Sequence, residues 1–113
     1  SKQSAEQIVE RLMQLPVGTK LMLLAPKVQG RKGEHEEILD AMRKQGFVRA
    51  RVNGEIYELE KTPKLDKKKK HRIEVVIDRF KVREDLGLRL AESFETALGL
   101  TDGLATISYL GSG

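Results

Sequence analysis

The chain has 113 residues, of which 39% are hydrophobic and 34% charged, a formal net charge of +4 and no cysteine, which predicts one domain with an ionic surface and excludes disulfides and thiolate metal sites. Its longest apolar run, residues 21–25, is too short to cross a membrane, and residues 1–10 are polar and helical in pattern rather than signal-like, so we expect a cytoplasmic protein. The basic charge permits nucleic acid, a membrane surface or an acidic protein as partner and selects none of them.

A helix and a strand are predicted first. Ser4 and Gln7 fit a capping box, in which each side chain bonds the other residue's backbone amide. Apolar residues then recur at helical spacing. Residues 20–25 form a continuous apolar run, which predicts a strand covered on both faces that stops at Pro26. We expect a basic surface loop at residues 30–33.

A second helix and a β-hairpin follow. Residues 34–45 carry acidic side chains in the first turn and basic ones in the last, which matches the helix dipole. Residues 47–52 alternate strictly, the pair Asn53-Gly54 is typical of a two-residue hairpin turn, and residues 55–59 return. This register predicts two faces, one with Val48, Ala50, Val52, Tyr57 and Leu59, and one with Phe47, Arg49, Arg51, Ile56 and Glu58.

The last part of the chain alternates between strand and helix patterns. Residues 62–70 are a lysine-rich linker, and residues 72–80 alternate as a strand. A third amphipathic helix is predicted to start near Asp85, and a last strand to cover residues 104–110. Residues 111–113 are rich in glycine and are expected to be a tail.

Together these elements predict a two-layer α+β domain over residues 1–110. Its sheet of about five strands should be largely antiparallel, with three amphipathic helices mainly on one face. The face of the hairpin that bears the arginines should then stay open.

Motifs for catalysis are missing from the sequence. Residues 30–33 are basic and flanked by glycine but lack the spacing and the Ser or Thr of a phosphate-binding loop. His35 and His71 are the only histidines and lie far apart in the sequence, which argues against a metal site. We therefore expect a protein that is not an enzyme and holds no cofactor.

Two basic features remain as candidates for binding. Residues 67–70 are four consecutive lysines, which suit either non-specific contact with phosphates or a mobile, solvated loop. No aromatic residue lies among them to stack on bases.

The second feature is Arg49 and Arg51, which alternate on one strand, together with Asp78-Arg79 at the end of another. Arginines on rigid strands suit bidentate ion pairs with a partner protein, although Arg49 could instead pair with Glu58 across the hairpin. The candidate partner-binding residues are Arg49, Arg51, Glu58, Asp78 and Arg79.

Three segments resemble the family of UvrA, the A subunit of the bacterial UvrABC excinuclease: K-Q-G-F-V-R-A-R-V-N-G at residues 44–54, K-H-R-I-E-V-V-I-D-R-F at 70–80 and R-L-A-E-S-F-E-T-A-L at 89–98. The resemblance implies an insertion that docks the UvrB subunit through an ionic contact in nucleotide excision repair, with Arg49 and Arg79 at positions that match its binding residues. It also implies that ATP and zinc belong to other parts of a dimeric, DNA-binding parent protein. This region is then expected to be a monomeric docking domain without a cofactor.

The alternative reading is a basic nucleic-acid-binding module. The net charge and the lysines at 67–70 favour it, whereas 17 acidic and only five aromatic residues weigh against it.

Overall fold

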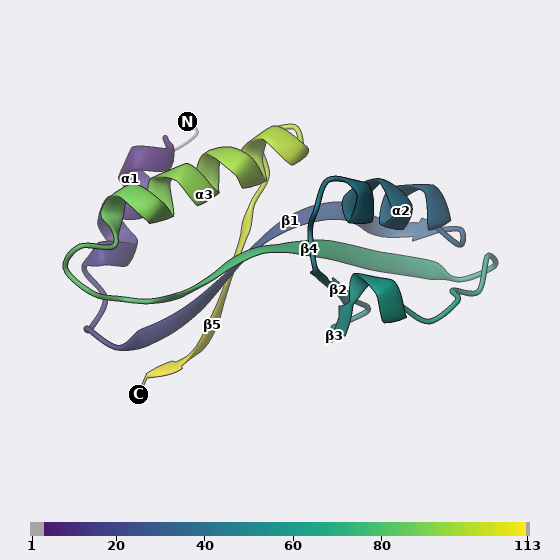
Figure 1. Cartoon of the computed structure of the whole chain (residues 1–113), viewed down its shortest axis with the longest axis horizontal. Coiled ribbons are helices and arrows are strands. Elements are labelled where there is room, and N and C mark those ends of the chain that lie inside the picture. Colours follow the sequence, from purple (N-terminus) through teal and green to yellow (C-terminus); the bar gives the residue numbers. More distant parts are fainter. Residues whose placement is uncertain (1–3, 113) are drawn as a thin grey trace.

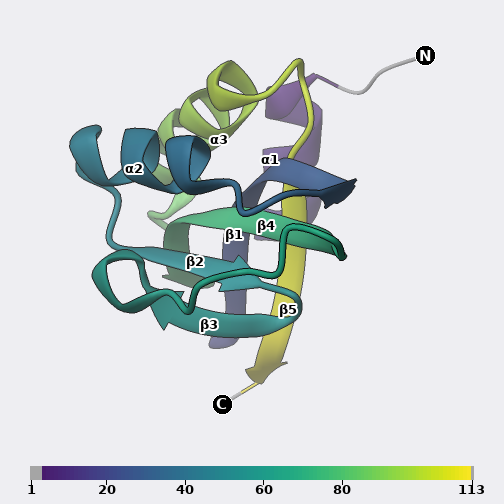
Figure 2. The ribbon, with the colours of Figure 1, turned by 90° about the vertical axis from the view of Figure 1, so that its right-hand side faces the viewer.

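The structure, a computed structural model, describes residues 4–112 and consists of a five-stranded antiparallel sheet with three α-helices on one face (Figure 1). The elements are α1 (Ala5–Met13), β1 (Thr19–Lys32), α2 (Glu36–Lys44), β2 (Arg49–Val52), β3 (Glu55–Glu58), the 3₁₀ helix η1 (Leu59–Lys61), β4 (Lys70–Lys81), α3 (Gly87–Leu100) and β5 (Thr106–Ser112). The strand order is β3-β2-β4-β1-β5. Figure 2 shows β5 running steeply across the direction of β2 and β3, as a strongly twisted sheet requires. The predicted two-layer α+β class is confirmed.

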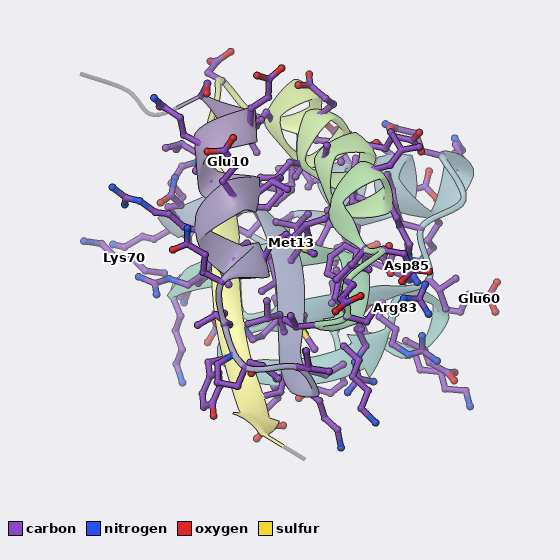
Figure 3. The ribbon with its side chains drawn as sticks, turned by 90° about the vertical axis from the view of Figure 1, so that its left-hand side faces the viewer. Glu10, Met13, Glu60, Lys70, Arg83 and Asp85 are labelled. Atoms are coloured by element: carbon purple, nitrogen blue, oxygen red, sulfur yellow. The ribbon has the colours of Figure 1, made fainter. Side chains whose placement is uncertain are left out.

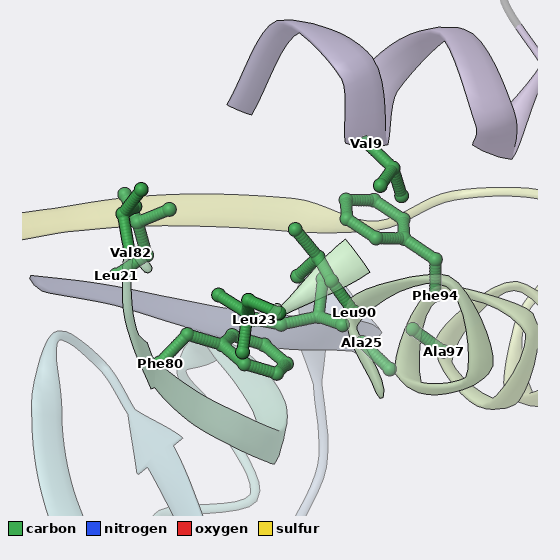
Figure 4. Packing of buried hydrophobic residues seen from close by; sticks show 10 residues of the cluster. Val9, Leu21, Leu23, Ala25, Phe80, Val82, Leu90, Phe94 and Ala97 are labelled. Carbon is green, nitrogen blue, oxygen red and sulfur yellow. The ribbon is translucent and has the colours of Figure 1, made fainter. Parts of the chain in front are cut away.

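Helices α1 and α3 cover one half of the sheet. The predicted capping box starts α1: the Ser4 amide donates to Gln7 Oε1 at 3.0 Å, and the Gln7 amide donates to Ser4 Oγ at 3.2 Å. Both helices pack on β1 and β4 around a first hydrophobic cluster (Figure 4), made of Val9, Leu21, Leu23, Ala25, Phe80, Val82, Leu86, Leu90, Phe94 and Ala97. Burial of each Leu or Phe side chain contributes about 1.5–3 kcal/mol to folding.

Strand β1 is longer than the sequence predicts. It continues through Pro26 to Lys32, so the predicted stop and the predicted loop at residues 30–33 are wrong. Beyond Leu24, β1 pairs with β4 alone, and its register shifts between Pro26 and Val28. A proline is tolerated in a strand at such an edge or bulge, where no partner needs its missing N–H.

Helix α2 and η1 cover the other half of the sheet. They pack around a second cluster of Val28, Leu39, Met42, Ala50, Val52, Leu59, Leu65, Ile73 and Val75. Ile77 packs against both clusters. The two cores thus lie side by side along the β1–β4 ladder, and each has its own helical cover.

The hairpin has its predicted register, from Arg49 opposite Glu58 to Val52 opposite Glu55. Asn53 and Gly54 have φ values of +50° and +89°, as a two-residue turn of this type requires. One part of the face assignment is wrong. Because β2 begins only at Arg49, Val48 is 58% exposed, while Phe47 packs on the second cluster.

Two boundaries and the nature of the linker in the last part of the chain also differ from the prediction. The predicted linker is anchored, because Leu65 is buried in the second cluster. Helix α3 begins at Gly87, and β5 continues to Ser112, so residues 111 and 112 of the predicted tail pair with β1. Residues 1–3 and residue 113 of the predicted domain and tail lie outside the described residues. Within residues 4–112, no helix has the length and hydrophobicity needed to span a bilayer.

Candidate functional site

The face of the sheet without helices, called the open face below, carries four of the five candidate residues: Arg49, Arg51, Glu58 and Arg79. Arg49 and Arg51 lie on it because the buried Ala50 between them points to the helical side. Arg79 reaches it through a bulge in β4, where Leu23 pairs with Asp78 but Leu24 with Val76. As a result Asp78 sits on the helical side and Arg79 on the open face.

Arg51 makes a bidentate ion pair within the domain. Its Nε and Nη2 donate to Oε1 and Oε2 of Glu74 on β4, each at 2.9 Å, and its Nη1 donates to Ser108 Oγ on β5 at 3.4 Å. The Glu74 side chain is only 6% exposed and that of Arg51 23%. The hydrogen bond to Glu74 is the main cause that raises the pKa of Arg51 above its ordinary value. Arg51 therefore links β2 to β4 and β5, and the carboxylate of Glu74 neutralises its charge within the domain.

Asp78 also has its partners inside the domain. Its carboxylate accepts from Arg89 Nη2 at 2.7 Å, from Arg89 Nε at 3.1 Å and from Ser93 Oγ at 3.1 Å, all on α3. It further accepts the backbone amide of Arg79 at 2.8 Å. These bonds raise the pKa of Arg89. Asp78 thus ties β4 to α3 and fixes the backbone from which Arg79 projects.

Arg49 and Arg79 differ from these two residues because both are exposed and neither side chain has a hydrogen bond or ion pair within residues 4–112. The alternative pairing of Arg49 with Glu58 is not formed: the two face each other across the hairpin, but Glu58 Oε2 lies 3.4 Å from Lys61 Nζ. From the strand spacing, the Cα atoms of Arg49 and Arg79 lie on the order of 10 Å apart. Two uncommitted guanidinium groups therefore share one rigid surface.

Sequence reasoning missed the role of Glu74 on this surface, whereas it placed Ile56 on the arginine face correctly. Glu74 lies in a run of apolar residues, and only the pairing of β2 with β4 identifies it as the partner of Arg51. Ile56, directly opposite Arg51 on β3, is 44% exposed and adds an apolar patch beside the arginines. Apolar contact area next to arginine is a common composition of protein interfaces.

The two histidines meet in space despite their separation in sequence, contrary to the expectation that neither has the other nearby. Their ring centroids lie 6.0 Å apart. Both nitrogens of His71 are engaged, Nδ1 with Asn53 Nδ2 at 3.0 Å and Nε2 with the Asp66 carbonyl at 2.7 Å, and His35 Nε2 bonds the Arg31 carbonyl at 2.9 Å. Within the described part of the chain, no three His, Asp or Glu residues gather as a metal site would require.

Comparison with known proteins places these features in a family context. Residues 3–111 match the family described as the UvrA interaction domain. The chain is 62% identical over 106 residues to the UvrABC system protein A of Pseudomonas aeruginosa, 56% over 108 residues to that of Haemophilus influenzae and 53% over 106 residues to that of Escherichia coli K12. These matches cover 94%, 96% and 94% of this chain but only 11%, 12% and 11% of the relatives, so the chain spans about one ninth of their length.

Proposed function

Because this chain belongs to the family of UvrA interaction domains, we propose that it docks the UvrB subunit of the excision-repair system through the open face of its sheet. The observation that carries the proposal is the contrast among the arginines. Arg51 is neutralised inside the domain, whereas Arg49 and Arg79 are exposed and uncommitted on the same face. Such groups suit carboxylates on a partner, since guanidinium binds carboxylate with two parallel hydrogen bonds.

The local structure supports this assignment because it fixes the backbone from which both arginines project before any partner binds. The hairpin register fixes the strand of Arg49, and the bonds of Asp78 fix the backbone of Arg79. A preorganised contact loses less conformational entropy on binding than a flexible one. The direct test is titration calorimetry of the 113-residue chain with purified UvrB, in which we expect saturable 1:1 binding. Absence of heat and of co-elution at low salt would refute the proposal.

The lysines at 67–70 are expected to be dispensable for docking. They lie at the far end of β4 from Arg79, outside the proposed contact. Replacing all four by Gln should slow association with UvrB at low salt, because peripheral charges act mainly by steering, and should weaken affinity by at most about 1 kcal/mol. Stopped-flow kinetics at two salt concentrations measure both effects. Complete loss of binding at moderate salt would place the lysines at the centre of the interface.

We also propose that the domain is non-catalytic and needs neither ATP nor zinc. No phosphate-binding loop and no cysteine occur in the sequence, and these supply the nucleotide and thiolate ligands of such sites. The purified chain should show no ATP turnover above a heat-denatured control and less than stoichiometric zinc by elemental analysis. Full zinc occupancy or measurable turnover would contradict this assignment.

A further inference from the structure

A second basic surface lies at the end of the β1–β4 ladder that is remote from α1 and α3 (Figure 1). There the register sets Lys32 opposite Lys70 and Gln29 opposite Arg72. The four lysines at 67–70 precede β4 directly. We call Lys32, residues 67–70 and Arg72 the basic end. The fold therefore brings together basic side chains from the end of β1 and from the start of β4, two segments that are distant in the sequence.

The turn that carries the lysines is held in a fixed conformation. Leu65 is buried immediately before it. The Asp66 carboxylate accepts the Lys68 amide at 2.9 Å, and the Asp66 carbonyl accepts both the Lys69 amide at 3.1 Å and His71 Nε2 at 2.7 Å. These bonds give the turn a defined backbone, while its four lysines stay exposed to solvent, as the solvated-loop alternative expects. A fixed turn displays its lysines without the ordering cost that a flexible loop would incur on binding.

The charges of this turn are not neutralised by the domain itself. Lys67, Lys68, Lys69 and Lys70 are exposed and form no ion pair within residues 4–112. The Lys70 side chain extends away from the body of the molecule (Figure 3). Nearby, Glu34 lies 3.9 Å from Lys64 Nζ and lines a depression with Arg31 and the first turn of α2. These acidic groups offset Lys64 and Arg31 and leave the lysine turn uncompensated.

We propose that the basic end binds the phosphate backbone of duplex nucleic acid without reading its sequence. Closely spaced lysines neutralise phosphates and release counterions, which is the main source of sequence-independent affinity. Residues 60–79 contain no Phe, Tyr or Trp, so the surface lacks the stacking groups with which proteins hold single strands. It also lacks an exposed amphipathic helix for insertion into a membrane surface, since α2 packs its apolar side on the second cluster.

The test compares two variants that remove the same charge from opposite ends of one ladder. Lys68→Gln with Lys69→Gln alters the basic end, and Lys20→Gln with Lys81→Gln alters the other end, where these two exposed lysines face each other. Binding to a fluorescent duplex of about 30 base pairs is measured by anisotropy at several salt concentrations. Thermal melts confirm that both variants stay folded.

We expect the Lys68 and Lys69 variant to bind the duplex at least about tenfold more weakly at about 50 mM salt. The slope of log affinity against log salt should also become shallower by about 1.8, because each lost phosphate contact removes about 0.9 from the slope. The Lys20 and Lys81 variant should change affinity less than about twofold. Two unrelated duplex sequences should bind equally.

Equal weakening by both variants would overturn the proposal, because only net charge would then matter. So would binding to phosphatidylserine vesicles or polyglutamate without binding to the duplex. The same Lys68 and Lys69 variant is also titrated with UvrB, and it should bind UvrB normally. A loss of duplex binding without a loss of UvrB binding then shows that the basic end and the docking face are separate surfaces.

Discussion

The double variant Arg49→Ala with Arg79→Ala is expected to lose UvrB binding while remaining folded. Truncating a charge at a desolvated interface costs about 2–5 kcal/mol, partly because the partner's carboxylate is left unpaired. Even the lower figure weakens binding about 30-fold for each arginine. The domain itself should tolerate the change, because neither guanidinium has a partner among residues 4–112. Titration calorimetry with UvrB and a thermal melt of the same sample measure both outcomes.

A charge-matched control makes this result specific. Lys68→Ala with Lys69→Ala also removes two positive charges, at the other end of β4 from Arg79, and it should retain UvrB binding at moderate salt. Near-native affinity in the folded Arg49 and Arg79 variant would show that these arginines are not the docking contact. Equal losses in both variants would show that binding depends only on overall charge.

Arg51→Ala is expected to destabilise the domain by about 3 kcal/mol, whereas removal of Arg49, two positions earlier and exposed, should leave the fold intact. Removal of Arg51 leaves the Glu74 carboxylate, 6% exposed, without its bidentate partner. A buried charge without a partner is among the most costly changes a folded protein can suffer. Urea denaturation monitored by circular dichroism gives the free energy of unfolding.

Arg49→Ala is the matched control for this measurement, since it removes the same side chain from the same strand and should cost less than about 0.5 kcal/mol. The paired replacement Arg51→Met with Glu74→Leu should recover most of the lost stability, because it removes both charges from the site at once. If Arg51→Ala is as stable as Arg49→Ala, the Arg51–Glu74 pair contributes nothing to the fold and Arg51 returns as a docking candidate.

The features that the sequence predicts correctly depend on short-range chemistry. The capping box of Ser4 and Gln7 involves residues three positions apart, and the hairpin register follows from two residues that tolerate positive φ. The open face also follows, because strict alternation separates the arginines of β2 from Ala50 and Val52. These elements therefore need no knowledge of the rest of the chain.

The features that the sequence does not predict depend on pairing between distant strands. Pro26 normally marks the end of a strand, yet β1 continues past it because the adjacent register shift and the free edge spare its missing N–H. The Arg51–Glu74 pair needs the alignment of β2 with β4. Without that alignment, Arg51 cannot be distinguished from Arg49. The sequence therefore does not reveal which arginine is paired inside the domain and which is available to a partner.

The chain forms β2 and β3 after β1 and before β4, although both lie outside the β1–β4 pair in the sheet, and this has a consequence for the order of folding. β1 and β4 form their ladder around everything from residue 33 to residue 69, and their innermost pair is Lys32 with Lys70. If α2, the hairpin and η1 condense first on Leu59 and Leu65, they bring the ends of that segment together, and the ladder can close outward from there toward Lys20 and Lys81. The local structure of residues 33–69 then already brings Lys32 and Lys70 close together, so pairing of β1 with β4 requires little further loss of chain entropy. By this route the second cluster is the nucleus, and the half covered by α1 and α3 assembles last.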